Sequence, residues 1–303
     1  MKKWLERLVA MSMTISALLL VTGCGGLAER PAAPPSKPVA AVRTGTFSFD
    51  GWNGPPLRVW YGLPDQVRAT TPVVFVMHGV NRDADRYLAE WAPLAARYRF
   101  IVVVPDFSQA SFPGSAGYNT GYLTDPNGAP RPRAQWSFAA LEPLFDAVKA
   151  RTGSRMPRYA LYGHSAGAQF VHRYVFFVPE ARLSRAVAAN AGWYTMPNLA
   201  TAYPYGLAGA PIGAAGLKRA LRKPLTILLG TSDTDVTDPN LRITPEANAQ
   251  GPHRFARGME FHRMGRATAG RLGGPFGWRV QDVPGVGHDN GKMAVAAAPL
   301  LVQ

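Results

Sequence analysis

Residues 158–177 read RYALYGHSAGAQFVHRYVFF, and this stretch decides the fold. Residues 158–162 have the pattern of a short buried strand, and residues 166–177 have that of a helix. Between them, GHSAG at 163–167 matches Gly-x-Ser-x-Gly, in which a serine sits on a sharp turn with its hydroxyl exposed and the glycines avoid collisions with neighbouring backbone. In a chain with 31 glycines this pattern also arises by chance. The strand–turn–helix context favours a reactive Ser165 over an ordinary glycine-rich turn.

From about Thr44 onward, strand and helix patterns alternate along the chain. Strands are predicted at 46–49, 57–62, 72–77, 100–104, 158–162, 183–189, 225–229 and 278–283. Helices are predicted at 84–98, 138–151 and 166–177, with a last helix from about residue 291. This alternation predicts an α/β fold with a mostly parallel central sheet, helices on both faces, and small loop or cap insertions. In such sheets, functional residues collect where the strands end.

Three more motifs follow predicted strands: MHGV at 77–80, GTSDTD at 230–235 and PGVGHDN at 284–290. Together with YGHSAG at 162–167 they resemble the α/β-hydrolase superfamily. The resemblance covers about Thr71 to Gln303. It is nearest to the secreted branch that contains polyhydroxybutyrate depolymerases, feruloyl and acetylxylan esterases and dienelactone-hydrolase-like proteins. Because this fold supports many different ester substrates, the resemblance implies the fold more specifically than the substrate.

The resemblance implies a catalytic triad in the chain order Ser165, Asp233, His288. Asp233 stands in the Gly-x-x-Asp that follows a strand, where this fold places its acid. Asp235 and Asp238 remain alternatives, because Asp-Thr-Asp and Asp-Pro-Asn are also ordinary turn sequences. The implied oxyanion donors are the backbone N–H groups of Val80 and Ala166.

The other five histidines fit a base less well than His288 does. His78 and His164 lie in the oxyanion and serine turns, and His172 lies about 10 Å down the helix from Ser165. His253 and His262 fall in an arginine-rich, helical segment that follows no strand.

The first 43 residues read as a leader and a tether. Residues 1–23 have a basic start and an apolar stretch, as a signal peptide does. Val21-Thr22-Gly23-Cys24 resembles the lipobox of bacterial lipoproteins, which implies that Cys24 is acylated and anchors the chain to a membrane. A plain secretory signal is the alternative. Residues 24–43, rich in proline and alanine, predict an extended tether, and residues 44–303 form the hydrolase domain. Gly25 in place of Asp favours the outer membrane.

Charge and cysteine content narrow the possible partners and sites. The net charge is +14, of which about +12 remains beyond the leader. The basic residues are scattered, so we expect no nucleic-acid partner; attraction to anionic lipid is more plausible. A group at Arg254, Arg257, Arg263, Arg266 and Arg271 could favour anionic substrates, although a solvated helix face is its commoner explanation. Since Cys24 is the only cysteine, the chain forms no internal disulfide and no cysteine-based zinc site.

These features predict a serine hydrolase of small or polymeric carboxylic esters, with no metal or cofactor implied. Alternatives are a peptidase or acyltransferase with the same triad, and a non-catalytic envelope binding protein. Loops at 109–135 and 190–215 follow strands and are expected to shape the substrate site. Trp136, Trp193 and Tyr194 are candidates for its apolar wall, and packing within the core or the loops is their alternative role.

Overall fold

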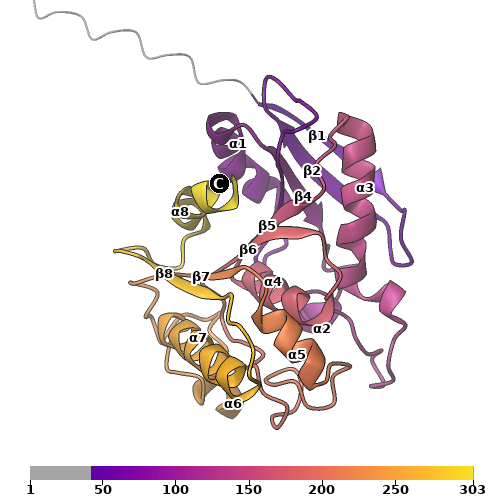
Figure 1. Cartoon of the computed structure of the whole chain (residues 1–303). Coiled ribbons are helices and arrows are strands. Elements are labelled where there is room, and N and C mark those ends of the chain that lie inside the picture. Colours follow the sequence, from indigo (N-terminus) through magenta and orange to yellow (C-terminus); the bar gives the residue numbers. More distant parts are fainter. Residues whose placement is uncertain (1–41, 303) are drawn as a thin grey trace, which may run out of the picture. The chain divides into compact units, whose positions relative to one another are not determined.

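A computed structural model describes residues 42–302, so Cys24, the leader and nearly all of the tether lie outside the described residues. One eight-stranded sheet runs through this part, in the order β1-β2-β4-β3-β5-β6-β7-β8. The strands are β1 (Arg43–Phe49), β2 (Leu57–Leu63), β3 (Val73–Met77), β4 (Ile101–Asp106), β5 (Tyr159–His164), β6 (Leu183–Ala189), β7 (Leu225–Gly230) and β8 (Arg279–Val283). β2 runs antiparallel to β1 and β4, and the other pairs are parallel, which confirms the predicted mostly parallel sheet (Figure 1).

The strand sequences follow from burial on both faces of the sheet. In β3, Phe75 and Met77 point into one apolar cluster, whereas Val74 and Val76 point into another on the opposite face. Successive side chains of a strand point to opposite faces of the sheet. A strand that is covered on both faces is therefore apolar at every position instead of alternating between apolar and polar residues. Burying each side chain of this size stabilises the folded state by about 1.5–3 kcal/mol relative to leaving it exposed to water.

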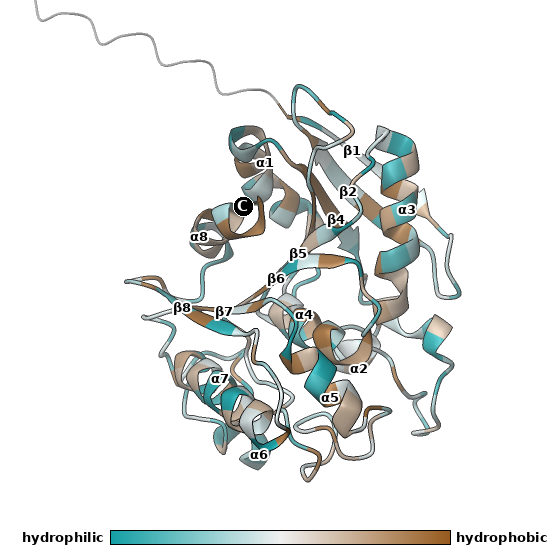
Figure 2. Ribbon diagram, viewed as in Figure 1, coloured by the Kyte–Doolittle hydropathy of each residue, from teal (hydrophilic) through white to brown (hydrophobic). Residues whose placement is uncertain are grey.

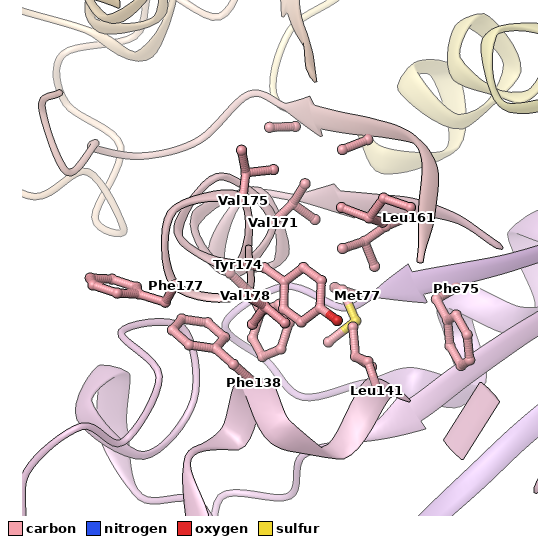
Figure 3. Close-up of a cluster of buried hydrophobic side chains, with 14 of the residues drawn as sticks. Phe75, Met77, Phe138, Leu141, Leu161, Val171, Tyr174, Val175, Phe177 and Val178 are labelled. Carbon is pink, nitrogen blue, oxygen red and sulfur yellow. The ribbon is translucent and has the colours of Figure 1, made fainter. Parts of the chain in front are cut away.

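Helices cover both faces. Their bounds are α1 (Ala84–Tyr98), α2 (Gly114–Gly117), α3 (Leu141–Thr152), α4 (Ala166–Phe177), α5 (Ala214–Leu221), α6 (Pro245–Asn248), α7 (Arg254–Arg271) and α8 (Asn290–Val302). α1 and α8 contribute side chains to one cluster, and α3, α4, α5 and α7 contribute to the other. Figure 1 shows α1 and α8 together on one side, and Figure 3 shows α4 packing Val171, Tyr174 and Val175 toward the sheet.

α4 is exceptional because every one of its residues is buried. Outer helices such as α3 carry both hydrophilic and hydrophobic residues, as Figure 2 shows, whereas α4 is enclosed by its neighbours. The polar residues of α4 must therefore find partners inside the protein. Arg173, for example, donates from Nε to Thr195 Oγ1 at 2.7 Å and from Nη1 to the carbonyl oxygens of Asn119 and Gln169.

The structure departs from the predicted elements in several places. The short helices α2 and α6 were not predicted, and α3 and α5 also differ from the prediction. The helix predicted from 138 begins at Leu141, and residues 137–140 form a 3₁₀ turn before it, as residues 133–135 do earlier. α5 begins at Ala214, at the end of a segment that the sequence predicted to be a loop. Its eight residues bury only Leu217, Ala220 and Leu221, too short a pattern to stand out in the sequence. From residue 42 to residue 302, no helix has the length and apolar character needed to cross a membrane.

Candidate active site

Ser165 occupies the turn between β5 and α4 with a positive φ, at φ 56° and ψ −116°. A non-glycine residue in such a conformation costs about 1–3 kcal/mol and persists only where its surroundings enforce it. Here they do: a Cβ at Gly163 would collide with the carbonyl of Gly167, and a Cβ at Gly167 would collide with the carbonyl of Met77. The two glycines of the motif are therefore required by close backbone packing around the serine.

His288 and Asp233 form a hydrogen-bonded pair. His288 Nδ1 lies 2.8 Å from Asp233 Oδ2, and the Asp233 side chain is 2% exposed. Asp233 belongs to the turn after β7, and His288 to the loop between β8 and α8. A buried carboxylate at Nδ1 fixes the ring orientation and leaves Nε2 free to act on a proton elsewhere.

Asn190, which the sequence did not single out, holds the two loops together. It ends β6 in a left-handed conformation with φ 49°. Its side-chain oxygen accepts from the Gly230 N–H at 2.8 Å, and its side-chain nitrogen donates to the Gly287 carbonyl at 3.0 Å. The loop that carries Asp233 and the loop that carries His288 are thus tied through one amide. A polar residue at the end of a buried strand is the only sequence signal for this role.

Ser165 and His288 line the same surface hollow. The full lining is Gly79, Val80, Asn81, Asp83, Arg86, Tyr87, Glu90, His164, Ser165, Asn240, His288, Asp289 and Asn290. Asp233 lies behind His288, so the three residues predicted for the triad converge on this hollow. The predicted oxyanion residue Val80 also lines it.

The turn before Val80 is locked by His78. Because the Phe107 N–H donates to His78 Nε2 at 3.1 Å, the ring proton is on Nδ1, which donates to the Gly79 carbonyl at 3.1 Å. Burial lowers the pKa of His78 to about 4, so the ring is neutral at pH 7. Tyr118 adds a hydrogen bond from its hydroxyl to the His78 carbonyl at 2.9 Å. A Cβ at Gly79 would lie 4.0 Å from the Ser165 Cβ, which places this turn beside the serine.

The other two buried histidines are also neutral. His164 packs its ring 4.6 Å from the His288 ring and has Nδ1 3.3 Å from the Tyr87 hydroxyl. His172 donates from Nδ1 to the Ala168 carbonyl and accepts the Thr195 N–H at Nε2. Burial holds the pKa of both rings well below the usual range.

Of the three candidate acids, Asp233 is the one that contacts His288. Asp235 is exposed and accepts hydrogen bonds from Thr237. Asp238 pairs with Arg254 at 2.9 Å. Across residues 42–302, no three His, Cys, Asp or Glu side chains converge in a way that could hold a metal ion.

The three aromatic residues predicted to line a substrate wall are buried in packing contacts and are not part of the hollow's lining. Trp136 packs on Phe177 and donates to the Arg131 carbonyl. Trp193 lies under the guanidinium of Arg173, at 4.2 Å from the ring centre. Tyr194 stacks on Phe261 of α7, with the two ring centres 4.5 Å apart.

The arginine group of α7 is only partly a solvated face. Arg263, Arg266 and Arg271 are exposed, but Arg254 and Arg257 are 1% and 0% exposed. These two occupy the first turn of α7, where a positive charge opposes the helix dipole. This mismatch with the helix dipole is the only sequence signal that the two guanidinium groups have partners inside the protein.

Comparisons with solved structures place this site in a known family. Poly(aspartic acid) hydrolase-1 from Sphingomonas sp. KT-1 is 53% identical over 87% of this chain and all of that chain, with a TM-score of 0.85. The chain belongs to the α/β-hydrolase superfamily. LpqC, the poly(3-hydroxybutyrate) depolymerase from Bordetella parapertussis, is 36% identical, covering 85% of this chain and 89% of that chain, with a TM-score of 0.81.

A more distant match shows the fold alone. The S-formylglutathione hydrolase from Agrobacterium tumefaciens is 16% identical, covering 86% of this chain and 94% of that chain, with a TM-score of 0.57. No family model and no curated protein matches the chain. The superfamily predicted from the four motifs is therefore confirmed, and the relatives support a serine hydrolase.

Replacing Gly167 with alanine should disrupt the serine turn. The added methyl would meet the Met77 carbonyl, a backbone atom that can move only with the sheet. We expect a melting temperature lower by several degrees and hydrolytic activity reduced at least 100-fold, measured by thermal unfolding and by ester hydrolysis.

Gly270→Ala is the matched control, because Gly270 is also helical but has open space around its Cβ position. Alanine there should leave activity unchanged and stabilise the fold by up to about 1 kcal/mol. Equal behaviour of the two variants would contradict the packing account of the turn.

The three buried neutral histidines predict a loss of stability in mild acid. Each has its pKa lowered by burial, so it is protonated in the unfolded chain below about pH 6.5 while remaining neutral in the folded protein. The free energy of unfolding should be at its full value above that pH. It should then fall as the pH approaches 5, by about 1.4 kcal/mol per pH unit for each histidine.

Urea unfolding at a series of pH values measures this slope. The three buried rings should together contribute an uptake of nearly three protons at about pH 5. His262, whose pKa burial also lowers, adds to this uptake, and His78→Asn should reduce the total by about one. A stability that stays constant between pH 7 and pH 5 would show that these rings are protonated in the fold.

Proposed function

We propose that this protein is a serine hydrolase that cleaves acyl bonds through a covalent acyl-enzyme on Ser165. The observation that carries the proposal is the hydrogen bond between His288 and the buried Asp233, made beside a hollow that also holds the strained Ser165. A hydroxyl is a weak nucleophile until an adjacent base takes its proton. This arrangement supplies a base with a fixed tautomer at the only serine in the hollow's lining.

In the proposed reaction, His288 takes the proton from Ser165 as its Oγ attacks the substrate carbonyl. Asp233 stabilises the resulting imidazolium. The N–H groups of Val80 and Ala166 bind the oxyanion, and loss of one such donor costs about 3 kcal/mol of transition-state stabilisation. His288 then protonates the leaving group, and water repeats the sequence on the acyl-enzyme to release the acid.

The substrate class that we propose first is a polymer of the poly(aspartic acid) kind. The relative with that activity is 53% identical over its whole length, and the net charge of about +12 that remains beyond the leader attracts a polyanion. The second candidate is a polyester, because the sequence predicts carboxylic-ester cleavage and the poly(3-hydroxybutyrate) depolymerase is 36% identical. The same acyl-enzyme chemistry serves an amide and an ester.

The proposed function predicts a hydrolysis that depends on Ser165. The wild-type protein should react with a fluorophosphonate probe and release short oligomers from poly(aspartic acid), because both reactions need an activated serine. Ser165→Ala should abolish both, and His288→Ala should reduce both by 10³-fold or more. Labelling is measured on gels, and polymer cleavage by size-exclusion chromatography.

Ser48→Ala is the control, since Ser48 is exposed on strand β1 and lies outside both the hollow's lining and the loops expected to shape the substrate site. Poly(3-hydroxybutyrate) film and p-nitrophenyl esters are tested in parallel. Cleavage of polyester but not of poly(aspartic acid) would select the second substrate class. A folded protein that neither labels nor cleaves any of these substrates would overturn the proposed function and favour a binding role.

We also propose that the chain is exported and anchored through Cys24. Support comes from the lipobox resemblance at residues 21–24 and from the position there of the only cysteine in the chain. Cells fed labelled palmitate should incorporate it into the wild-type protein and not into Cys24→Ser, and only the wild-type protein should fractionate with membranes. Label retained by Cys24→Ser would contradict the anchor.

A further inference from the structure

A buried arginine stands directly behind the Asp233–His288 pair. Arg254 is 1% exposed, and its Nη1 lies 3.5 Å from Asp233 Oδ1 and 2.9 Å from Asp238 Oδ2. The Asp238 side chain is 19% exposed, so it reaches the buried guanidinium from the surface. Arg254 thus lies in contact with two carboxylates, that of Asp233, which binds His288, and that of Asp238.

The order of these charges has a consequence for His288. The Arg254 charge competes with a protonated His288 for the same Asp233 carboxylate, which alone would weaken the imidazolium. Asp238 holds the guanidinium more closely than Asp233 does and offsets much of its charge. In a low-dielectric site such offsets are worth far more than they are in water.

We propose that Asp238 and Arg254 are positioning residues that set how strongly Asp233 stabilises the imidazolium of His288. The inference rests on the proposed serine-hydrolase function. It gives Asp238 a role other than that of the triad acid, and it explains why the first turn of α7 begins with a buried arginine.

The backbone around these side chains makes the network rigid. Asp238 Oδ1 accepts the Asn240 N–H at 2.7 Å, and Asn240 lines the hollow that holds Ser165. The carbonyl of Asp233 accepts the Phe255 N–H at 3.2 Å, which fixes the acid against the start of α7. Asp238 therefore both offsets the charge of Arg254 and holds the backbone of Asn240 at the rim of the hollow.

Other groups around His288 also bear on its protonation. The charged and titratable side chains that face it or share its hollow are Asp83, Arg86, Tyr87, Glu90, His164, Asp233, Asp238, Arg254 and Asp289. Arg86 is paired with both Asp83 and Glu90, which leaves one net negative charge, and Asp289 lies 3.6 Å from Lys292. All five of these side chains are at least 23% exposed, so water screens their charges. The Asp238–Arg254 pair differs because its cation is buried.

The test is the pH dependence of fluorophosphonate inactivation, which reports serine reactivity without a known substrate. Asp238→Asn removes the compensating negative charge, so a protonated His288 becomes less favourable. We expect the midpoint of the acidic limb to move down by about one pH unit, with a lower rate on the plateau. Arg254→Met removes the competing positive charge, so the midpoint should move up by a similar amount.

The double variant Arg254→Met/Asp238→Asn should bring the midpoint back to within a few tenths of a unit of wild type, because it restores the net charge. Asp235→Asn is the matched control: it makes the same change in the same loop, but its side chain is exposed, and its midpoint should not move. A purely structural role would lower reactivity in both single variants without moving their midpoints in opposite directions.

The possible outcomes separate this inference from the proposed function. A wild-type protein that does not react with the probe means that the proposed function fails. A reactive wild type whose Asp238→Asn midpoint coincides with that of Asp235→Asn overturns the inference alone. If Arg254→Met does not fold by circular dichroism, the contrast between Asp238→Asn and Asp235→Asn decides the matter, since both are near-surface changes.

Discussion

The positive-φ backbone at Ser165 is the constraint on which the rest of the site depends. It is held by contacts that leave no room for a side chain at Gly163 or Gly167, and the packing partner of Gly167 is the end of the neighbouring strand β3. A strained turn of this kind lasts only on a rigid platform. The doubly covered sheet and the wholly buried helix α4 provide that platform.

The second requirement is that a buried carboxylate keep its charge. Asp233 is almost fully removed from water, and an unpaired carboxylate there would be too costly to remain ionised. Its partners come from two directions: His288 from the hollow and Arg254 from the start of α7. Asn190 then ties the loop of Asp233 to the loop of His288 across the end of β6. The hollow's chemistry therefore depends on residues that never line it.

How much of this arrangement the sequence predicts depends on how far apart the interacting residues lie along the chain. The buried strands, α1 and α4 were predictable because local periodicity encodes them, and Ser165, Asp233 and His288 because each stands just after a strand. Asn190 and Arg254 act on partners 40 and 21 residues away, and no local pattern encodes such a pair. The predicted aromatic wall failed to appear in the hollow's lining because Trp193 is as well suited to cover a buried guanidinium as to contact a substrate.

The proposed function depends on one atom, the Ser165 hydroxyl oxygen. The most direct test is rapid quenching of the protein with p-nitrophenyl acetate, followed by intact-mass measurement and peptide mapping. The account predicts a mass increase of one acetyl group, located on the peptide that contains Ser165. An acetyl group on any other residue, or turnover of the ester with no acetyl on Ser165 at any quench time, would contradict it.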